Sequence, residues 1–222
     1  MTGLSSRYSK NEELANALSH LTGAFLAIAA LVLLEVKAVR IGNGWHIVCS
    51  AIFGATMIIL FFSSTMTHWL RQGKAKDVFF TIDQIAIFTL IAGTYTPFSL
   101  IALHGPLGWL IFGLEWGFAL IGITIKLVRP TRFNQGVNLF YILLYAAMGW
   151  MLLIAIVPLY KSLSLMGVLW VLTGGLCYTI GIFFYRQARF KHHHLVWHLL
   201  VIAGASCHFF GIYYYVLPIM VR

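Results

Sequence analysis

Charged residues are scarce in this chain, at 9% of 222 residues, and only six residues are acidic. Soluble proteins carry about 25% charged residues, because polar side chains must cover a water-exposed surface. Hydrophobic residues make up 60% of the chain, well above the roughly 45–50% of soluble domains. The composition therefore excludes a soluble globular domain and predicts a chain that lies in a lipid bilayer.

Cysteine is also rare, and its placement excludes a disulfide framework. Cys49, Cys177 and Cys207 each lie inside an apolar segment, where a free cysteine behaves as a small hydrophobic residue. The net charge of +9 does not indicate nucleic-acid binding, because the basic residues form short clusters between apolar segments. With no separate basic domain to contact phosphates, we exclude nucleic acid as a partner.

Long apolar segments, bounded by charges, glycine or proline, occupy most of the chain. About 20 apolar residues suffice for a helix to cross a bilayer, and short loops make consecutive helices antiparallel. We therefore predict an all-α membrane protein, a seven-transmembrane helix bundle that forms a single domain over residues 1–222. The predicted spans are 18–36, 45–66, 79–103, 109–127, 137–159, 165–185 and 195–217.

Lysine and arginine are distributed unevenly between the two sets of loops. Of the 15 basic residues, eleven fall on one side and four on the other. Because cytoplasmic loops are enriched in these residues, the N-terminus is predicted to be cytoplasmic and the C-terminus outside. The richer side carries Arg7, Lys10, Arg71, Lys74, Lys76, Lys126, Arg129, Arg132, Arg186, Arg189 and Lys191; the other side carries Lys37, Arg40, Lys161 and Arg222.

With this topology, five ionisable side chains share one depth near the cytoplasmic face. They come from four predicted spans, and ionisable groups inside a membrane are costly enough to be functional candidates. Their convergence predicts a polar site at the cytoplasmic ends of the helices. The five residues are His20, His68, Asp83, His194 and His198.

The histidines of this group have the spacing of metal ligands. His194 and His198 are four residues apart, which stacks both imidazoles on one helix face, and His68 supplies a third nitrogen. Three protein ligands with one open position are typical of catalytic zinc, although imidazole also suits copper, iron and nickel. Ser64 lies on the face of His68, and Asp83 can accept a hydrogen bond from an imidazole or a bound water. Because three histidines are consecutive at 192–194, the spacing alone is also compatible with an ordinary interfacial loop.

Further polar residues lie in or near the predicted spans. Glu13, Asn16 and His20 form one helical stripe, which we interpret as a layer supporting the metal ligands rather than an ordinary polar helix start. His208 lies ten residues beyond His198, about 15 Å deeper, and is predicted to form an interhelical hydrogen bond. Glu115, in the middle of the fourth span, is predicted to be neutral or hydrogen-bonded within the bundle.

Five ordered stretches carry a resemblance to a known family. They are residues 12–20 (EELANALSH), Ser64 and His68 followed by Asp83, residues 93–97 (GTYTP), residues 145–150 (YAAMGW), and residues 194–198 (HLVWH) continuing to His208 and Phe209. Together they resemble the hemolysin III family, the bacterial branch of the progestin and adipoQ receptor superfamily, over nearly the whole chain. Thr67 and Gln84 depart from the aromatic and histidine that the family commonly has there.

The resemblance implies a zinc ion held by His68, His194 and His198, with Ser64 and Asp83 beside it, in a multi-pass protein of a bacterial inner membrane. Resemblance to the wider superfamily, which contains alkaline ceramidases, implies hydrolysis of lipid amides or esters at the inner leaflet. A lipid amide or fatty acid would then be the ligand, Asp83 would orient water or take its proton, and Ser64 would hold the oxyanion. One alternative is a non-catalytic sensor or regulator of the membrane with a structural zinc. Another is the cytolytic pore former of the family's name.

Overall fold

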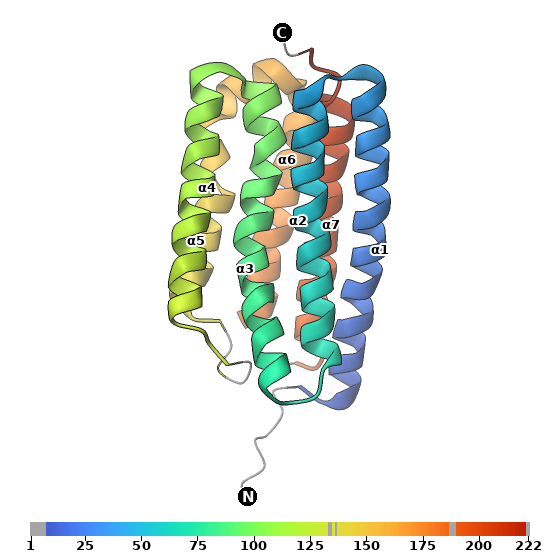
Figure 1. The fold of residues 1–222 in the computed structure, drawn as a ribbon, viewed down its shortest axis with the longest axis vertical. Helices are drawn as coiled ribbons and strands as arrows, with labels where there is room; N and C mark the ends of the chain where they lie inside the picture. Colours follow the sequence, from blue (N-terminus) through green and yellow to red (C-terminus); the bar gives the residue numbers. More distant parts are fainter. Residues whose placement is uncertain (1–7, 133–134, 136, 187–189, 221–222) are drawn as a thin grey trace, which may run out of the picture.

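The computed structural model describes residues 8–132, 135, 137–186 and 190–220, and the regular elements in them are all helical. The helices run side by side along the long axis of the molecule, and the chain begins at the lower end and finishes at the upper end (Figure 1). We call the lower end, where α1 begins, the site end. The α-helices are α1 Lys10–Ile41, α2 Gly44–Trp69, α3 Lys74–Pro97, α4 Gly105–Val128, α5 Leu139–Gly149, α6 Ile156–Arg186 and α7 His193–Gly211.

Particular residues at the helix ends explain where the helices begin and stop. Ser9 caps α1 in a capping box, accepting a hydrogen bond from the backbone N–H of Glu12, while the Glu12 carboxylate accepts one from the backbone N–H of Ser9. Pro97 has no N–H to continue the ladder of α3, and the chain continues as a π-helix, Phe98–Leu103. Gly105, with φ of 62°, then supplies the left-handed turn into α4.

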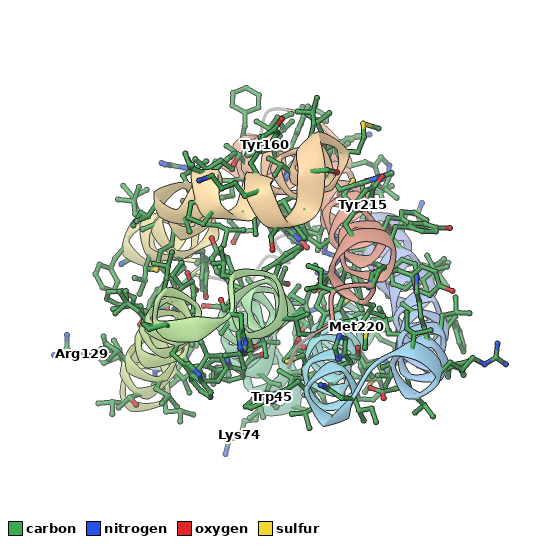
Figure 2. The ribbon with its side chains drawn as sticks, turned by 90° about the horizontal axis from the view of Figure 1, so that it is seen from above. Trp45, Lys74, Arg129, Tyr160, Tyr215 and Met220 are labelled. Carbon is green, nitrogen blue, oxygen red and sulfur yellow. The ribbon has the colours of Figure 1, made fainter. Side chains whose placement is uncertain are left out.

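Neighbouring helices close into a bundle around a buried core. α1 packs against α2 and α7, α3 packs against α2, α4 and α5, and α6 packs against α7. Figure 2 looks down this bundle, with Lys74 and Arg129 extending away from it. Large apolar side chains also cover the outward faces, as expected for contact with lipid, and include Phe25, Val39, Phe118, Ile121, Ile154 and Phe183.

Six helical stretches among the described residues are long and apolar enough to cross a membrane. One of them, Leu139–Arg186, has 48 residues and would be about 72 Å long as a straight helix, more than twice a hydrocarbon core. This stretch is not straight. It contains the 3-10 helix Met151–Ala155, and Ser164 has non-helical φ and ψ of 63° and 175°.

The prediction of an all-helical membrane fold is confirmed by these elements. The helices extend beyond the predicted spans at the site end, since α1 begins at Lys10 and α2 continues to Trp69. Apolar runs mark the part of a helix inside the bilayer, whereas polar turns can continue it toward water. Three residues that entered the charge count, Arg7, Arg189 and Arg222, lie outside the described part of the chain.

Candidate metal centre

Three buried histidines from α2 and α7 meet at the site end of the bundle. The Nε2 atom of His194 lies 3.2 Å from Nε2 of His68 and 3.1 Å from Nε2 of His198. One ligand nitrogen from each ring lies within 4.8 Å of the other two, so the group can hold a metal ion. The four-residue spacing on α7 aligns two of the rings, and the packing of α2 within the bundle brings the third.

Hydrogen bonds on the far side of two rings determine where their protons lie. The Nδ1 atom of His68 is 2.7 Å from the Glu13 carboxylate, and Nδ1 of His198 is 3.1 Å from the backbone carbonyl of Asn16. Because these oxygens accept hydrogen bonds, each Nδ1 carries the proton, and each Nε2 offers a lone pair. Two lone pairs therefore converge on His194, which can donate to only one of them, and a cation satisfies this arrangement.

The side chain of Glu13 supports His68 and also binds a lysine. Its second carboxylate oxygen, Oε1, accepts a hydrogen bond from the Lys76 ammonium at 2.9 Å. Lys76 is only 2% exposed and also donates to the backbone carbonyl of Leu70, at 3.3 Å. The first turn of α1 thus reaches both the metal-ligating end of α2 and the start of α3.

The remaining residues of the predicted α1 stripe lie against His198. His20 stacks on the His198 ring, with 3.5 Å between centroids and 15° between planes. Asn16 contacts His198 through its backbone carbonyl rather than its amide, which has no hydrogen-bond partner among the described residues. Ser19 adds a contact that the sequence analysis missed, because its hydroxyl lies 3.0 Å from Nδ1 of His198.

Two further residues were not anticipated, Tyr8 and Glu12. The Tyr8 ring is buried and stacks on His194, with centroids 5.0 Å apart. Glu12 Oε1 accepts a hydrogen bond from the backbone N–H of His192 at 3.0 Å, which places a carboxylate at the N-terminus of α7. Glu12 stands in the 12–20 stretch that carries the family resemblance, but no spacing in the sequence indicates that it reaches α7.

Asp83 and Ser64 line the same cavity as the three histidines. Their side chains lie against each other where α3 and α2 pack. The cavity has a volume of about 140 Å³ and continues between α3, α5, α6 and α7. Its walls beyond the histidines are mostly aliphatic and aromatic, and include Ile87, Leu90, Ile91, Ile142, Tyr145, Trp150, Ile182 and Val201.

His208 lies at the far end of this cavity, apart from the metal-binding group. Its Nε2 is 3.2 Å from the backbone carbonyl of Val171 on α6, the interhelical hydrogen bond that the sequence predicts. Ten residues of α7 separate it from His198, so the cavity extends for about 15 Å along the helix. Glu115 is fully buried on α4, and both of its carboxylate oxygens are without a hydrogen-bond partner among the described residues.

Comparison with known proteins identifies the family. The model of the family described as "Haemolysin-III related" matches residues 8–209. The chain belongs to this family. Hemolysin-3 of Bacillus cereus is 40% identical over 207 residues, which cover 93% of each chain, and the Hemolysin-3 homolog of Bacillus subtilis is 43% identical over 190 residues, covering 86% of this chain and 87% of the homolog.

A more distant relative extends the similarity beyond bacteria. The human monocyte to macrophage differentiation factor is 25% identical over 196 residues, which cover 86% of this chain and 78% of that protein. The resemblance noted in the sequence is therefore confirmed. Family membership and the apolar helices together identify the chain as a multi-pass membrane protein with a three-histidine site that can hold a metal ion.

Proposed function

We propose that this protein is a zinc-dependent hydrolase of lipid amides or esters in a bacterial inner membrane. The observation that carries the proposal is the shape of the site. Three imidazoles converge at one end of a cavity whose walls are mostly apolar, and Asp83 and Ser64 lie in the same wall. A polar reaction centre at the end of an apolar cavity suits a substrate with a polar linkage and a hydrocarbon chain.

The donor set fits zinc. Tetrahedral zinc holds nitrogen ligands at about 2.0–2.1 Å, which puts neighbouring nitrogens about 3.3–3.4 Å apart. The observed separations of 3.2 Å and 3.1 Å from His194 to His68 and His198 are close to this value. Three neutral imidazoles leave a fourth position free, as in catalytic rather than structural zinc sites. A zinc ion held here would supply Lewis-acid polarisation of the substrate carbonyl and activation of water.

Asp83 and Ser64 have the chemistry that hydrolysis requires beside such an ion. The Asp83 carboxylate would orient the attacking water and take its proton. The Ser64 hydroxyl would donate a hydrogen bond to the oxygen that becomes negative in the transition state. His68 and His198 would stay in one tautomer throughout, because Glu13 and the backbone carbonyl of Asn16 hold their Nδ1 protons.

The proposed substrate class is tested with the purified protein and lipids of defined chemistry. We expect the zinc-loaded protein to release fatty acid from at least one ceramide, N-acyl or ester lipid in a broad panel. Protein stripped with a chelator should release none, and activity should return when zinc is added. Mass spectrometry of the released fatty acid measures the reaction. If the fully loaded protein releases nothing from the whole panel, the hydrolase proposal fails.

We also propose that the chain crosses the membrane seven times, with the site end in the cytoplasm. The break at Ser164 supports division of the 48-residue stretch into two spans, and the 11-to-4 charge asymmetry supports the orientation. Two reporters are fused in turn after Arg222, one that is active only in the cytoplasm and one that is active only outside it. We expect activity only from the second. Activity of the cytoplasmic form at that position would refute an odd number of spans with this orientation.

A second candidate is a non-catalytic regulator in which zinc joins helices. The histidines come from α2 and α7, and Glu13 adds a contact from α1, so an ion here would stabilise the packing of three helices. In that case the loaded protein binds lipid without cleaving it, and zinc raises its melting temperature.

A further inference from the structure

The first turn of α1 carries two adjacent carboxylates that reach different helices around the metal centre. Glu12 accepts a hydrogen bond from the backbone N–H of His192, one residue before α7 begins. Glu13 bonds His68 near the end of α2 and Lys76 in the first turn of α3. These two carboxylates therefore connect α1 to all three other helices at the site end that carry metal-site residues.

Lys76 has an unusual environment for a lysine at the end of a membrane helix. Such side chains usually extend toward water, as Lys74 does: it is exposed and points away from the bundle (Figure 2). Lys76, two residues later, turns inward and is 2% exposed. Burying an ammonium is costly unless it is paired and hydrogen-bonded, so its contacts specify one position for it.

Lys76 contacts two groups that determine where His68 lies, the Glu13 carboxylate and the end of α2. Its ammonium donates to Oε1 of Glu13 at 2.9 Å, while Oε2 of the same carboxylate binds Nδ1 of His68 at 2.7 Å. It also donates at 3.3 Å to the carbonyl of Leu70, the residue that caps α2 two positions after His68. A carboxylate fixed at one oxygen has little freedom to rotate at the other, so the direction of the His68 ring depends on this lysine.

We propose that Lys76 is a positioning residue of the metal centre and acts through Glu13. It holds the carboxylate so that Oε2 accepts the proton of His68 Nδ1, and this keeps the Nε2 lone pair directed at the ion. The contact to Leu70 holds the end of α2 at the same time. Lys76 does not line the cavity that contains the three histidines, so it acts on the centre from outside. The spacing on α3 agrees with this position, since Lys76 lies seven residues before Asp83 and thus on the same face of the helix.

The test compares zinc affinity, measured by competition with a chelating dye, in purified full-length variants. Lys76→Met and Glu13→Gln should each weaken zinc binding roughly 10–100-fold, the usual effect of losing a residue that orients a ligand. Lys76→Arg, which keeps the charge and the donors, should stay within a few-fold of wild type. The matched control is Lys74→Met, which removes the same charge from an exposed position two residues away and should leave the affinity unchanged.

A double variant separates positioning from general stabilisation. If Lys76 acts through Glu13, then Lys76→Met combined with Glu13→Gln binds zinc about as weakly as Glu13→Gln alone. Losses that multiply in the double variant would overturn the proposal, as would wild-type affinity in Lys76→Met. Should Lys76→Met not fold, Lys76→Gln takes its place, because it keeps an N–H donor for Leu70 and loses the charge. Wild-type zinc affinity in that variant would equally overturn the proposal.

Discussion

Replacing His194 and His198 together with alanine is expected to remove nearly all zinc from the purified protein. Each substitution deletes one of three converging Nε2 atoms, and the single remaining imidazole of His68 cannot hold the ion against a chelator. Either single substitution should weaken binding by more than the roughly 10–100-fold expected for a residue that only orients a ligand. Metal analysis of the purified variants measures the effect.

His208→Ala is the control for this experiment. His208 is a buried histidine of the same helix, but it bonds the carbonyl of Val171 and lies outside the three-histidine group. This variant should keep its zinc while losing some thermal stability, since a buried hydrogen bond and ring are removed. Equal zinc loss from His208→Ala would mean that helix packing was being measured. Unchanged zinc in the double variant would refute the ligand assignment.

Asp83→Asn should retain zinc and lose most lipid hydrolysis. Asp83 lines the cavity beside the three histidines but is not part of the group that can hold the ion. The amide keeps the shape of the carboxylate and cannot take a proton from water, so we expect a loss of about 10²-fold or more in turnover. Fatty-acid release and zinc content, measured on the same preparation, test both parts of the prediction.

The same variant distinguishes the hydrolase from the regulator. A site that only joins helices would respond to Asp83→Asn with a change in melting temperature, and lipid binding would remain as in wild type. Ser64→Ala is the companion variant, because it removes the hydroxyl that lies against Asp83. A fully active, fully metallated Asp83→Asn protein would exclude Asp83 as the group that accepts the proton.

The sequence was sufficient to predict the helical membrane fold and the meeting of His68, His194 and His198. The length of an apolar run identifies a helix that can cross the bilayer, and the charges of the loops predict which way each helix crosses it. Residues far apart in the chain can therefore be predicted to lie at the same depth in the membrane. The four-residue spacing on α7 then supplies two rings on one face. These arguments use only periodicity and topology, and neither depends on the details of side-chain packing.

The contacts that the sequence did not predict depend on the direction of individual side chains and on backbone atoms, which no sequence pattern gives. Lys74 and Lys76 look alike in the sequence, and both count as positive charges at a membrane surface. Only the structure shows that Lys76 on α3 turns inward to Glu13 on α1. Tyr8 precedes the first helix, so no periodicity assigns it to the His194 ring. The Asn16 contact through its backbone carbonyl is likewise invisible to a pattern of side chains.

The separation of the ligands along the chain has a consequence for biosynthesis. His68 lies 126 residues before His194. Glu12 accepts its hydrogen bond from the backbone N–H of His192, which lies 180 residues later in the chain. A membrane protein is synthesised from its N-terminus, so α1, α2 and α3 enter the bilayer while α7 is still being made. A nascent chain has one of the three imidazoles until its last helix is inserted. If these histidines hold zinc as proposed, loading is a late event, and zinc occupancy reports that α7 has packed against the rest of the bundle.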